Sequence, residues 1–471
     1  MAGLSFPKSF IFGAATSAYQ IEGAVHEDGR GESTWDRFSH RPGTIKNGDT
    51  GDVACDSYHR VDEDIALMKD IGLQAYRFSI AWPRIIPDGD GKVNPKGLDW
   101  YSRLVDELLA AGIQPFATMY HWDLPQALED KYGGWRSRKT SEAFRRYADT
   151  IVKHLGDRVR SWMPLNEMPA AVVAAYGWGS HAPGVKETRR GLNQVQHHVL
   201  LGHGYGVRAV REHGREDSEV GTAHNARAYV PAYDSPDCIE AAARAFAHYN
   251  GPMLESMSRG RYPAKWLSGL GADAPQVEPG DMEIISTPCD FIGLNIYSGT
   301  WVRPPADAPD AVPIPPTNTG IPSLALDPTR EDGFLEIAMP PGYPRVCPGG
   351  IPLVPQSIYW AIRHAVEIYG YSKIYITENG CAVDDELVNG EVLDVDRVHY
   401  YRAHLRSAAQ AIAEKLPVAG YFIWSLLDNF EWGMGYSSRC GFHYVDFETQ
   451  QRTPKLSARF YASCIAARRV L

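Results

Sequence analysis

Two glutamates stand next to asparagines, each at the end of a strand-like segment, and the two segments are far apart in the chain. Glu378 lies near the end of the segment "KIYITENG" (373–380), and Glu167 follows Asn166 in "RVRSWMPLNEM" (158–168). A desolvated carboxylate without a partner is costly, so each of these groups must be paired or used. Two carboxyl groups facing one pocket suit the hydrolysis of a glycosidic bond, with one as nucleophile or base and the other as acid.

The two roles require different surroundings. A nucleophile must be ionised and therefore needs a cation and hydrogen-bond donors, for which Arg77 and Tyr297 are the candidates. An acid must hold its proton near neutral pH, which an apolar wall and a nearby negative charge favour. Apolar residues surround Glu167 in the sequence, namely Trp162, Met163, Met168 and Pro169. The sequence leaves open the distance between the two carboxyl groups, which separates retention at roughly 5 Å from inversion at a wider gap.

Other polar and aromatic residues also lie at or just beyond the ends of predicted strands. If these strands form a parallel barrel, their C-terminal ends share one face, and the side chains converge on one mouth. The candidates are Gln20, Arg77, His121, Trp122, Asn166, Asn295, Tyr297, Trp424, Glu431 and Trp432.

Short β-rich runs alternate with longer amphipathic runs along the whole chain. This alternation predicts an α/β protein, a single-domain (β/α)8 TIM barrel over residues 1–471 with extended loops at its C-terminal face. A doubly wound open sheet is the alternative, but no nucleotide-binding G-x-G-x-x-G follows the first strand. The predicted strands are 10–18, 74–80, 114–121, 160–166, 219–225, 290–297, 373–379 and 418–426.

Three amphipathic segments illustrate the predicted helices, and one segment departs from the pattern. Residues 94–112, 141–156 and 394–415 show apolar residues at helical spacing, and Gly112 ends the first of them. Residues 301–355 are rich in Pro and Gly, and we expect them to form a loop that lines the mouth of the site, with a plain surface insertion as the alternative.

The composition argues against several classes of partner. The net charge is −10 and the pI about 5.9, which does not favour nucleic acids or anionic membranes. No apolar run reaches membrane-spanning length, and the N-terminus has no secretion-signal pattern. The 7 cysteines lack paired spacing and are expected to be reduced thiols of a cytoplasmic protein. The 12 Trp and 25 Tyr fit a large core, or alternatively the stacking of rings on sugars.

A series of motifs along nearly the whole chain resembles glycoside hydrolase family 1, the family of β-glucosidase-like retaining enzymes. The motifs are "FIFGAATSAYQIEGA" (10–24), "YRFSIAWPRIIP" (76–87), "HWDLPQAL" (121–128), "NE" (166–167), "HAPG" (181–184), "FIGLNIYS" (291–298), "ITENG" (376–380), "WSLLDNFEW" (424–432) and "GFHYVDF" (441–447). Their number and order make chance agreement improbable.

The resemblance implies a role for each candidate residue. Glu378 matches the nucleophile and Glu167 the acid/base, while Arg77 and Tyr297 match the residues that orient the nucleophile. Asn166 matches the residue that binds the sugar 2-hydroxyl, and Asn295 a supporting polar residue. Gln20, His121, Trp424, Glu431 and Trp432 match the pocket for the terminal sugar, and Trp122 follows His121 at the same strand end.

The segment around the acid/base differs from the family pattern. The family usually reads Thr-Phe/Leu-Asn-Glu-Pro, whereas this chain has Pro164 and Met168 on either side of Leu165, Asn166 and Glu167. Pro164 removes a backbone donor within a strand, and Met168 replaces a rigid residue, so both bear on the placement of Glu167.

The expected substrate is a small β-glucoside or oligosaccharide such as cellobiose, as in cellulose degradation, and the retained Glu167 favours ordinary O-glycosides over thioglucosides. Two alternatives remain: a 6-phospho-β-glycosidase and a non-catalytic sugar-binding barrel. Neither cofactor nor metal is expected, although "HHVLLGH" (197–203) holds three histidines. The oligomeric state is open.

Overall fold

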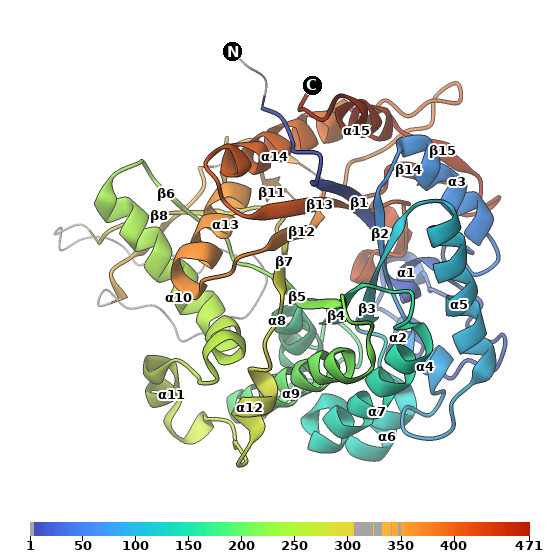
Figure 1. The fold of residues 1–471 in the computed structure, drawn as a ribbon, viewed down its shortest axis with the longest axis horizontal. Coiled ribbons are helices and arrows are strands. Elements are labelled where there is room, and N and C mark those ends of the chain that lie inside the picture. The colour runs from blue at the N-terminus through green and yellow to red at the C-terminus, as the bar shows by residue number, and fades with distance from the viewer. Residues whose placement is uncertain (1–3, 306–323, 325–331, 341, 347–349) are drawn as a thin grey trace.

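Eight parallel strands form a closed barrel at the centre of the protein, as seen in the computed structural model, which describes residues 4–305, 324, 332–340, 342–346 and 350–471 (Figure 1). The strands follow one another around the barrel in the order β1-β13-β12-β7-β5-β4-β3-β2. They are β1 (Ile11–Ala15), β2 (Ala75–Ser79), β3 (Gln114–Tyr120), β4 (Ser161–Leu165), β5 (Glu219–Asn225), β7 (Phe291–Asn295), β12 (Ile374–Asn379) and β13 (Val418–Trp424). All eight lie within the predicted strands, so the (β/α)8 barrel is confirmed.

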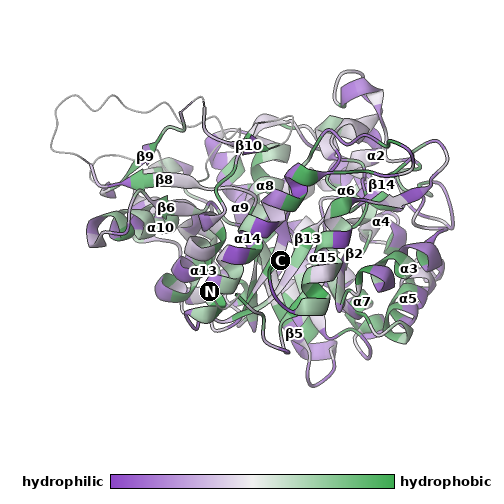
Figure 2. Ribbon diagram, turned by 90° about the horizontal axis from the view of Figure 1, so that it is seen from above, coloured by the Kyte–Doolittle hydropathy of each residue, from purple (hydrophilic) through white to green (hydrophobic). Residues whose placement is uncertain are grey.

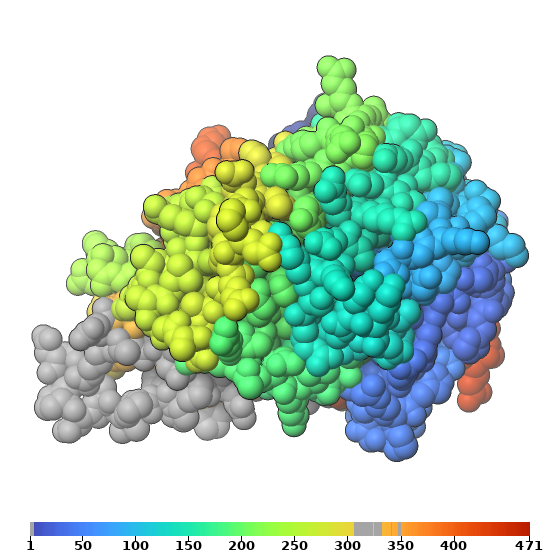
Figure 3. Space-filling view, turned by 90° about the horizontal axis from the view of Figure 1, so that it is seen from below, coloured from blue at the N-terminus to red at the C-terminus, as the bar shows by residue number. Residues whose placement is uncertain are grey.

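Long helices surround the barrel and cover its outer face (Figure 1). They are α3 (Val61–Ile71), α5 (Pro95–Ala110), α7 (Arg138–Leu155), α9 (Arg189–His213), α10 (Pro236–Arg259), α13 (Gln356–Tyr369), α14 (Val395–Ala413) and α15 (Leu456–Ala467). Helices such as α3 and α5 carry both hydrophobic and hydrophilic residues (Figure 2). Seen from below, the teal, green and yellow segments lie side by side, in keeping with the packing of α7 on α9 and of α9 on α12 (Asp281–Ile285) (Figure 3).

The ends of the helices follow from local sequence. Pro95 opens α5, where its missing N–H costs no helical hydrogen bond, and Gly112 just beyond α5 adopts a φ of 75°. The Thr188 side chain caps α9 by accepting a hydrogen bond from the Gly191 amide at 3.1 Å. The three helices predicted from periodicity correspond to α5, α7 and α14.

Buried apolar side chains form two separate clusters. One cluster lies inside the barrel and includes Phe116, Met163, Phe291, Tyr375 and Phe422. The larger cluster lies between the strands and the helices. Because the interior is packed, the polar residues at the strand ends must lie above this layer, at the C-terminal mouth.

Short elements occupy the connections between strands and helices. Before α9 they are α1 (Ala18–Ile21), α2 (Thr34–Ser39), α4 (Trp82–Ile85), α6 (Gln126–Tyr132) and α8 (Met168–Val172). Farther along they are α11 (Ala264–Leu270) and the strands β6 (Tyr229–Pro231), β8 (Thr300–Arg303), β9 (Leu335–Ile337), β10 (Arg345–Val346), β11 (Ile351–Pro352), β14 (His443–Val445) and β15 (Arg452–Pro454).

The segment predicted as a loop over residues 301–355 is only partly described. Its described residues include β9, β10 and β11 and most of β8, and β8 and β9 form a sheet with β6. Residues 306–323, 325–331, 341 and 347–349 lie outside the described residues. That this segment lines the mouth stays a prediction.

The two ends of the described chain meet. The Phe6 amide donates a hydrogen bond to the Arg468 carbonyl oxygen at 2.8 Å, and Ser5 pairs with Arg469. The segment before β1 is therefore tied to the segment after α15.

Candidate active site

Glu378, at the end of β12, is the most strongly paired carboxylate at the mouth. It is only 3% exposed, and the Arg77 guanidinium donates to its Oε1 at 2.6 Å. The Tyr297 hydroxyl donates to Oε2 at 2.6 Å. Burial and the Glu378 charge hold the pKa of Tyr297 well above its usual range, so the phenol keeps its proton. Arg77 and Tyr297 thus each contact one oxygen of Glu378.

A local irregularity of β12 brings Glu378 to the mouth. Tyr375 lies in the barrel interior and Ile376 in the outer core, so strict alternation would place Glu378 on the same side as Ile376. The pairing with β7 shifts between Ile376 and Glu378, so that Glu378 lies opposite Asn295. Such shifts redirect side chains near active sites.

Glu167 lies across the same mouth in a different environment. Its Oε1 accepts a hydrogen bond from the Asn295 amide at 2.8 Å, and the side chain is only partly exposed. Burial, followed by the negative charge of Glu378, raises the pKa of Glu167 to about 8, although Asn295 and Arg77 act in the opposite direction. Glu167 therefore holds a proton at neutral pH.

Backbone contacts hold Glu167 in place beside the unusual residues Pro164 and Met168. Strand β4 pairs with β5 at Ser161 and Trp162, and the pairing resumes only at Asn166 opposite Ala223, so the break falls where Pro164 lacks a donor. The Glu167 amide donates to the Ala223 carbonyl oxygen at 2.7 Å, which anchors the residue beyond the break. Met168 is fully buried and begins α8.

Asn166 connects the two carboxyl groups through a shared network. Its Oδ1 accepts hydrogen bonds from Arg77 at 2.6 Å and from Asn295 at 3.1 Å. Its Nδ2 donates to Nε2 of His121 at 2.9 Å. Burial and the nearby Arg77 charge lower the pKa of His121 well below its usual range, so the imidazole is neutral.

A second wall of the mouth is built around Glu431. Gln20 and the Trp424 indole each approach its Oε2 at 3.4 Å. Burial raises the pKa of Glu431 to about 8, with the Glu378 charge adding to the effect and the bonds from Trp424 and Gln20 opposing it. Near neutral pH the free Glu431 carboxyl keeps its proton and can both donate and accept hydrogen bonds.

Aromatic rings line this wall. The His121 ring stacks on Trp424 with centroids 5.7 Å apart, and Trp122 packs on Trp432 at 4.7 Å. The flat faces of such rings suit the C–H faces of a sugar. The structure therefore gathers all the predicted site residues at one end of the barrel.

Three residues of the site were not found by sequence reasoning. Trp35 packs on Trp432 with centroids 4.5 Å apart, Asn429 accepts a hydrogen bond from Gln20 at 3.0 Å, and Thr377 donates to Asn295 at 2.7 Å. Thr377 stands directly before Glu378, and Asn429 stands two residues before Glu431, which is a usable signal. Trp35 follows no predicted strand, and nothing in its sequence context marks it.

The histidines of α9 lie apart from this mouth. His197 pairs with Asp281 at 2.8 Å and His198 contacts the Trp135 carbonyl oxygen, so the histidines of α9 have protein partners. Within the described part of the chain, no cluster of metal-ligating side chains occurs, and no helix is long and apolar enough to cross a membrane. Cys55, Cys238, Cys289, Cys440 and Cys464 are free thiols.

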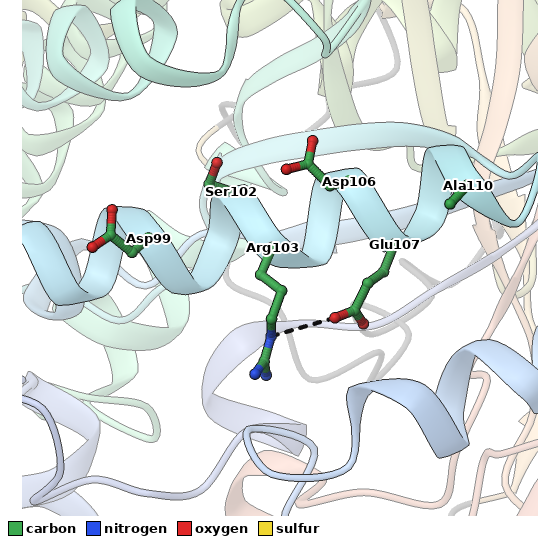
Figure 4. A pocket seen from close by; sticks show the side chains of 6 residues that line it. All are labelled: Asp99, Ser102, Arg103, Asp106, Glu107 and Ala110. Carbon is green, nitrogen blue, oxygen red and sulfur yellow. Dashed lines mark ion pairs between the residues drawn. The ribbon is translucent and has the colours of Figure 1, made fainter.

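A surface cavity of about 460 Å³ lies elsewhere, on the outer face of α5 (Figure 4). A single helix supplies its lining, which includes the ion pair of Arg103 and Glu107 at 3.5 Å. None of its residues is at a strand end, so it is separate from the candidate active site.

A barrel that presents an ion-paired carboxylate and a protonated carboxyl group at one aromatic-lined mouth has the site of a glycoside hydrolase. A family model described as Glycosyl hydrolase family 1 matches residues 3–470, and the chain belongs to this family. It is therefore an enzyme, an O-glycosyl hydrolase.

Named relatives and solved structures agree with this membership. The chain is 42% identical to Beta-glucosidase A of Acetivibrio thermocellus over 472 residues, which cover 99% of both chains. It is also 42% identical to a Beta-glucosidase of an Agrobacterium species, over 97% of this chain and 95% of the relative. A family 1 β-glucosidase from Thermotoga maritima superposes with a TM-score of 0.87 at 39% identity and covers 100% of both chains. The complex of a T. maritima family 1 β-glucosidase with isofagomine lactam gives 0.86 at 40% identity, with 99% of both chains covered.

Proposed function

We propose that this enzyme is a retaining exo-β-glucosidase that releases terminal β-D-glucosyl residues from cellobiose and from aryl or alkyl β-glucosides. The observation that carries the proposal is the contrast between two carboxyl groups at one mouth. Glu378 is in an ion pair with Arg77, whereas the pKa of Glu167 is raised to about 8 by burial and by Glu378. The β-glucosidase relatives support the choice of sugar.

In the first step, Glu378 attacks the anomeric carbon while Glu167 protonates the departing glycosidic oxygen. The products of this step are a covalent glycosyl-enzyme and the free aglycone. In the second step, Glu167, now a carboxylate, removes a proton from water, which displaces Glu378 and leaves the sugar with its original configuration. Asn166, held by Arg77, is placed to bind the 2-hydroxyl group.

Recognition of the terminal sugar is assigned to the wall around Glu431. We expect the Glu431 carboxyl group to bind the hydroxyl groups on C4 and C6, with Gln20 and His121 beside O3 and O4 and Trp424 as the stacking surface; the contacts among these residues support this. Gln20 is held in this wall by the hydrogen bond that it donates to the Phe430 carbonyl oxygen at 3.0 Å. The single domain over residues 1–471 and the cytoplasmic location stay predictions.

The relative reactivity of a 6-phosphorylated substrate tests the substrate class. Among the described residues, the side-chain hydrogen bonds to Glu431 come from Gln20 and Trp424, and neither lysine nor arginine pairs with it. A phosphate on O6 would be a buried charge without a cationic partner in this wall, so we expect kcat/KM for p-nitrophenyl β-glucoside to exceed that for its 6-phosphate on the order of a thousandfold.

The same measurement separates the alternatives. Equal kcat/KM values, or a preference for the phosphate, would favour a 6-phospho-β-glycosidase and remove the role given to Glu431. Turnover of neither compound by the folded protein would favour a non-catalytic sugar-binding barrel.

A further inference from the structure

Six charged side chains form a buried network behind the wall around Glu431. Three are acidic and three basic, so the network is balanced in formal charge. Its members are Asp385, Asp394, Arg397, Asp428, Arg439 and Lys455. The Arg439 side chain is 19% exposed, and the other five have no measurable exposure.

Lys455 joins two loops that come from different strands. Its ammonium group donates to Oδ2 of Asp385 at 2.6 Å and to Oδ1 of Asp428 at 2.6 Å. Asp385 lies in the loop that follows Glu378 and β12. Asp428 belongs to residues 425–431, here called the Glu431 loop. Lys455 itself precedes α15, so one ammonium group ties both loops to the last helix.

The other members extend this connection toward the catalytic strand. Arg397 donates to Oδ2 of Asp385 at 2.8 Å and to the Cys381 carbonyl oxygen at 3.2 Å, three residues beyond Glu378. On the opposite side, Arg439 donates to Oδ2 of Asp428 at 2.7 Å. A continuous set of hydrogen bonds thus runs from the backbone after Glu378 to Asp428.

Asp428 in turn fixes the residues that face the sugar. It is followed directly by Asn429, whose Oδ1 accepts from Gln20 at 3.0 Å, and by Phe430, whose amide donates to the Gln20 carbonyl oxygen at 3.1 Å. Glu431 comes next. Displacement of Asp428 would therefore move Gln20 and Glu431 together.

Stability alone is a weak reason for such a network. Burying charges is expensive, and well-packed apolar residues of similar volume often replace a buried ion pair without loss of stability. Charged hydrogen bonds, however, have narrow geometry, so they define the position of a loop more closely than apolar contacts do. Here the loop that they define carries the wall for the terminal sugar.

We propose that Lys455 is a positioning residue for sugar recognition: by holding Asp428 against Asp385, it sets the position of Gln20 and Glu431 relative to Glu378. This inference rests on the proposed binding of the sugar C4 and C6 hydroxyl groups by Glu431. It assigns Lys455 an effect on which glycosides are accepted, beyond any effect on folding.

The test measures the ratio of kcat/KM for two substrates in the variant Lys455→Met. A β-xyloside lacks the C6 hydroxymethyl group, so the ratio of kcat/KM for p-nitrophenyl β-glucoside to that for p-nitrophenyl β-xyloside reports the contact at C6. We expect this ratio to fall by at least about fivefold in Lys455→Met, the effect of losing about one hydrogen bond. Arg459→Met is the matched control, because Arg459 is an exposed residue of the same helix, paired with Glu391 at 3.1 Å, and its ratio should stay that of the wild type.

Arg439→Met provides a second variant, since its partly exposed side chain holds the other oxygen of Asp428. Arg439→Met should also lower the ratio, and this variant tests the proposal if Lys455→Met does not fold. A ratio that stays within about twofold of the wild-type value in the folded variants would overturn the proposal, even if both rates fell. Failure of the wild type to hydrolyse either glycoside would instead count against the proposed function.

Discussion

At the scale of single residues, the two catalytic candidates differ in their hydrogen-bond and ion-pair partners. Glu378 has one oxygen on a guanidinium and the other on a phenol, both at 2.6 Å, whereas Glu167 receives one amide hydrogen bond and faces the charge of Glu378. The same side-chain type can therefore serve as nucleophile in one place and as acid in the other.

Replacement of Glu378 tests the nucleophile. We expect Glu378→Ala to remain folded and to lose at least about ten-thousandfold in kcat, because no group replaces the attacking oxygen. Added azide should restore turnover of an activated aryl β-glucoside and yield the α-glucosyl azide, because azide enters from the side that the carboxylate vacated. Formation of the β-azide, identified by NMR, would disprove this assignment.

Replacement of Glu167 tests its role as the acid, by comparing two substrates that differ in their leaving groups. An activated aryl glucoside needs little protonation, so its glycosylation step should survive in Glu167→Gln, while cellobiose should lose about a hundredfold or more. Pre-steady-state and steady-state rates for both substrates provide the measurement. Equal losses in the glycosylation step would show that Glu167 is not the acid.

The pH dependence follows from the raised pKa of Glu167. The group must be protonated to act as an acid, so wild-type kcat/KM should be retained below pH 8 and fall as the pH rises through about 8, where the free enzyme loses this proton. The alkaline fall should disappear in Glu167→Gln assayed with the activated glucoside. Its persistence would assign the fall to another group, with Glu431 the first candidate because its pKa is also raised to about 8.

At the scale of elements, the break in β4 is compensated by packing against α9. A Cβ atom on Gly206 of α9 would lie 2.6 Å from Cβ of Pro164 and 3.3 Å from the sulfur of Met119. Helix and strand therefore approach closely only because Gly206 has no side chain. This contact holds the strand segment just before Asn166 and Glu167.

Introducing a methyl group at this contact should destabilise the protein. We expect Gly206→Ala to lower the free energy of unfolding by about 1–3 kcal/mol through overpacking, despite the better helix propensity of alanine. Gly177→Ala is the control, because its Cβ would meet no atom closer than 3.5 Å. Denaturant unfolding of both variants checks this, and an equal effect in the two would contradict the role of the close contact.

The strands were predictable because each is a short, mostly apolar segment that alternates with amphipathic helical segments, whereas smaller features left no such pattern. The shift in pairing beside Thr377, which turns Glu378 toward the mouth, depends on contacts with β7 and cannot be read from β12 alone. The strands β8 to β11, of two to four residues each, lie in a segment rich in Pro and Gly, where composition favours a loop.

The candidate site was predicted from motif residues and strand ends, but its electrostatics were not. The raised pKa of Glu431 arises from burial among residues of separate elements, which no local pattern reveals. Trp35 and Lys455 were missed for the same reason: one reaches the mouth from α2, and the other reaches the Glu431 loop from the start of α15.

At the scale of the whole molecule, closure of the barrel brings together residues from opposite ends of the chain. Gln20 follows the first strand and Glu431 the last, and they meet because β1 pairs with β13. Arg77 and Glu378 are separated by 301 positions and form an ion pair at 2.6 Å. The proposed chemistry therefore requires the complete barrel.

The configuration of the first sugar released tests the central claim most directly. Hydrolysis of p-nitrophenyl β-glucoside followed by ¹H NMR should show β-glucose as the first product, with the α anomer appearing only later by mutarotation, because two displacements at the anomeric carbon restore its configuration. α-Glucose as the first product, or no glucose released by the folded enzyme, would contradict the account of a retaining β-glucosidase with Glu378 and Glu167 as its catalytic pair.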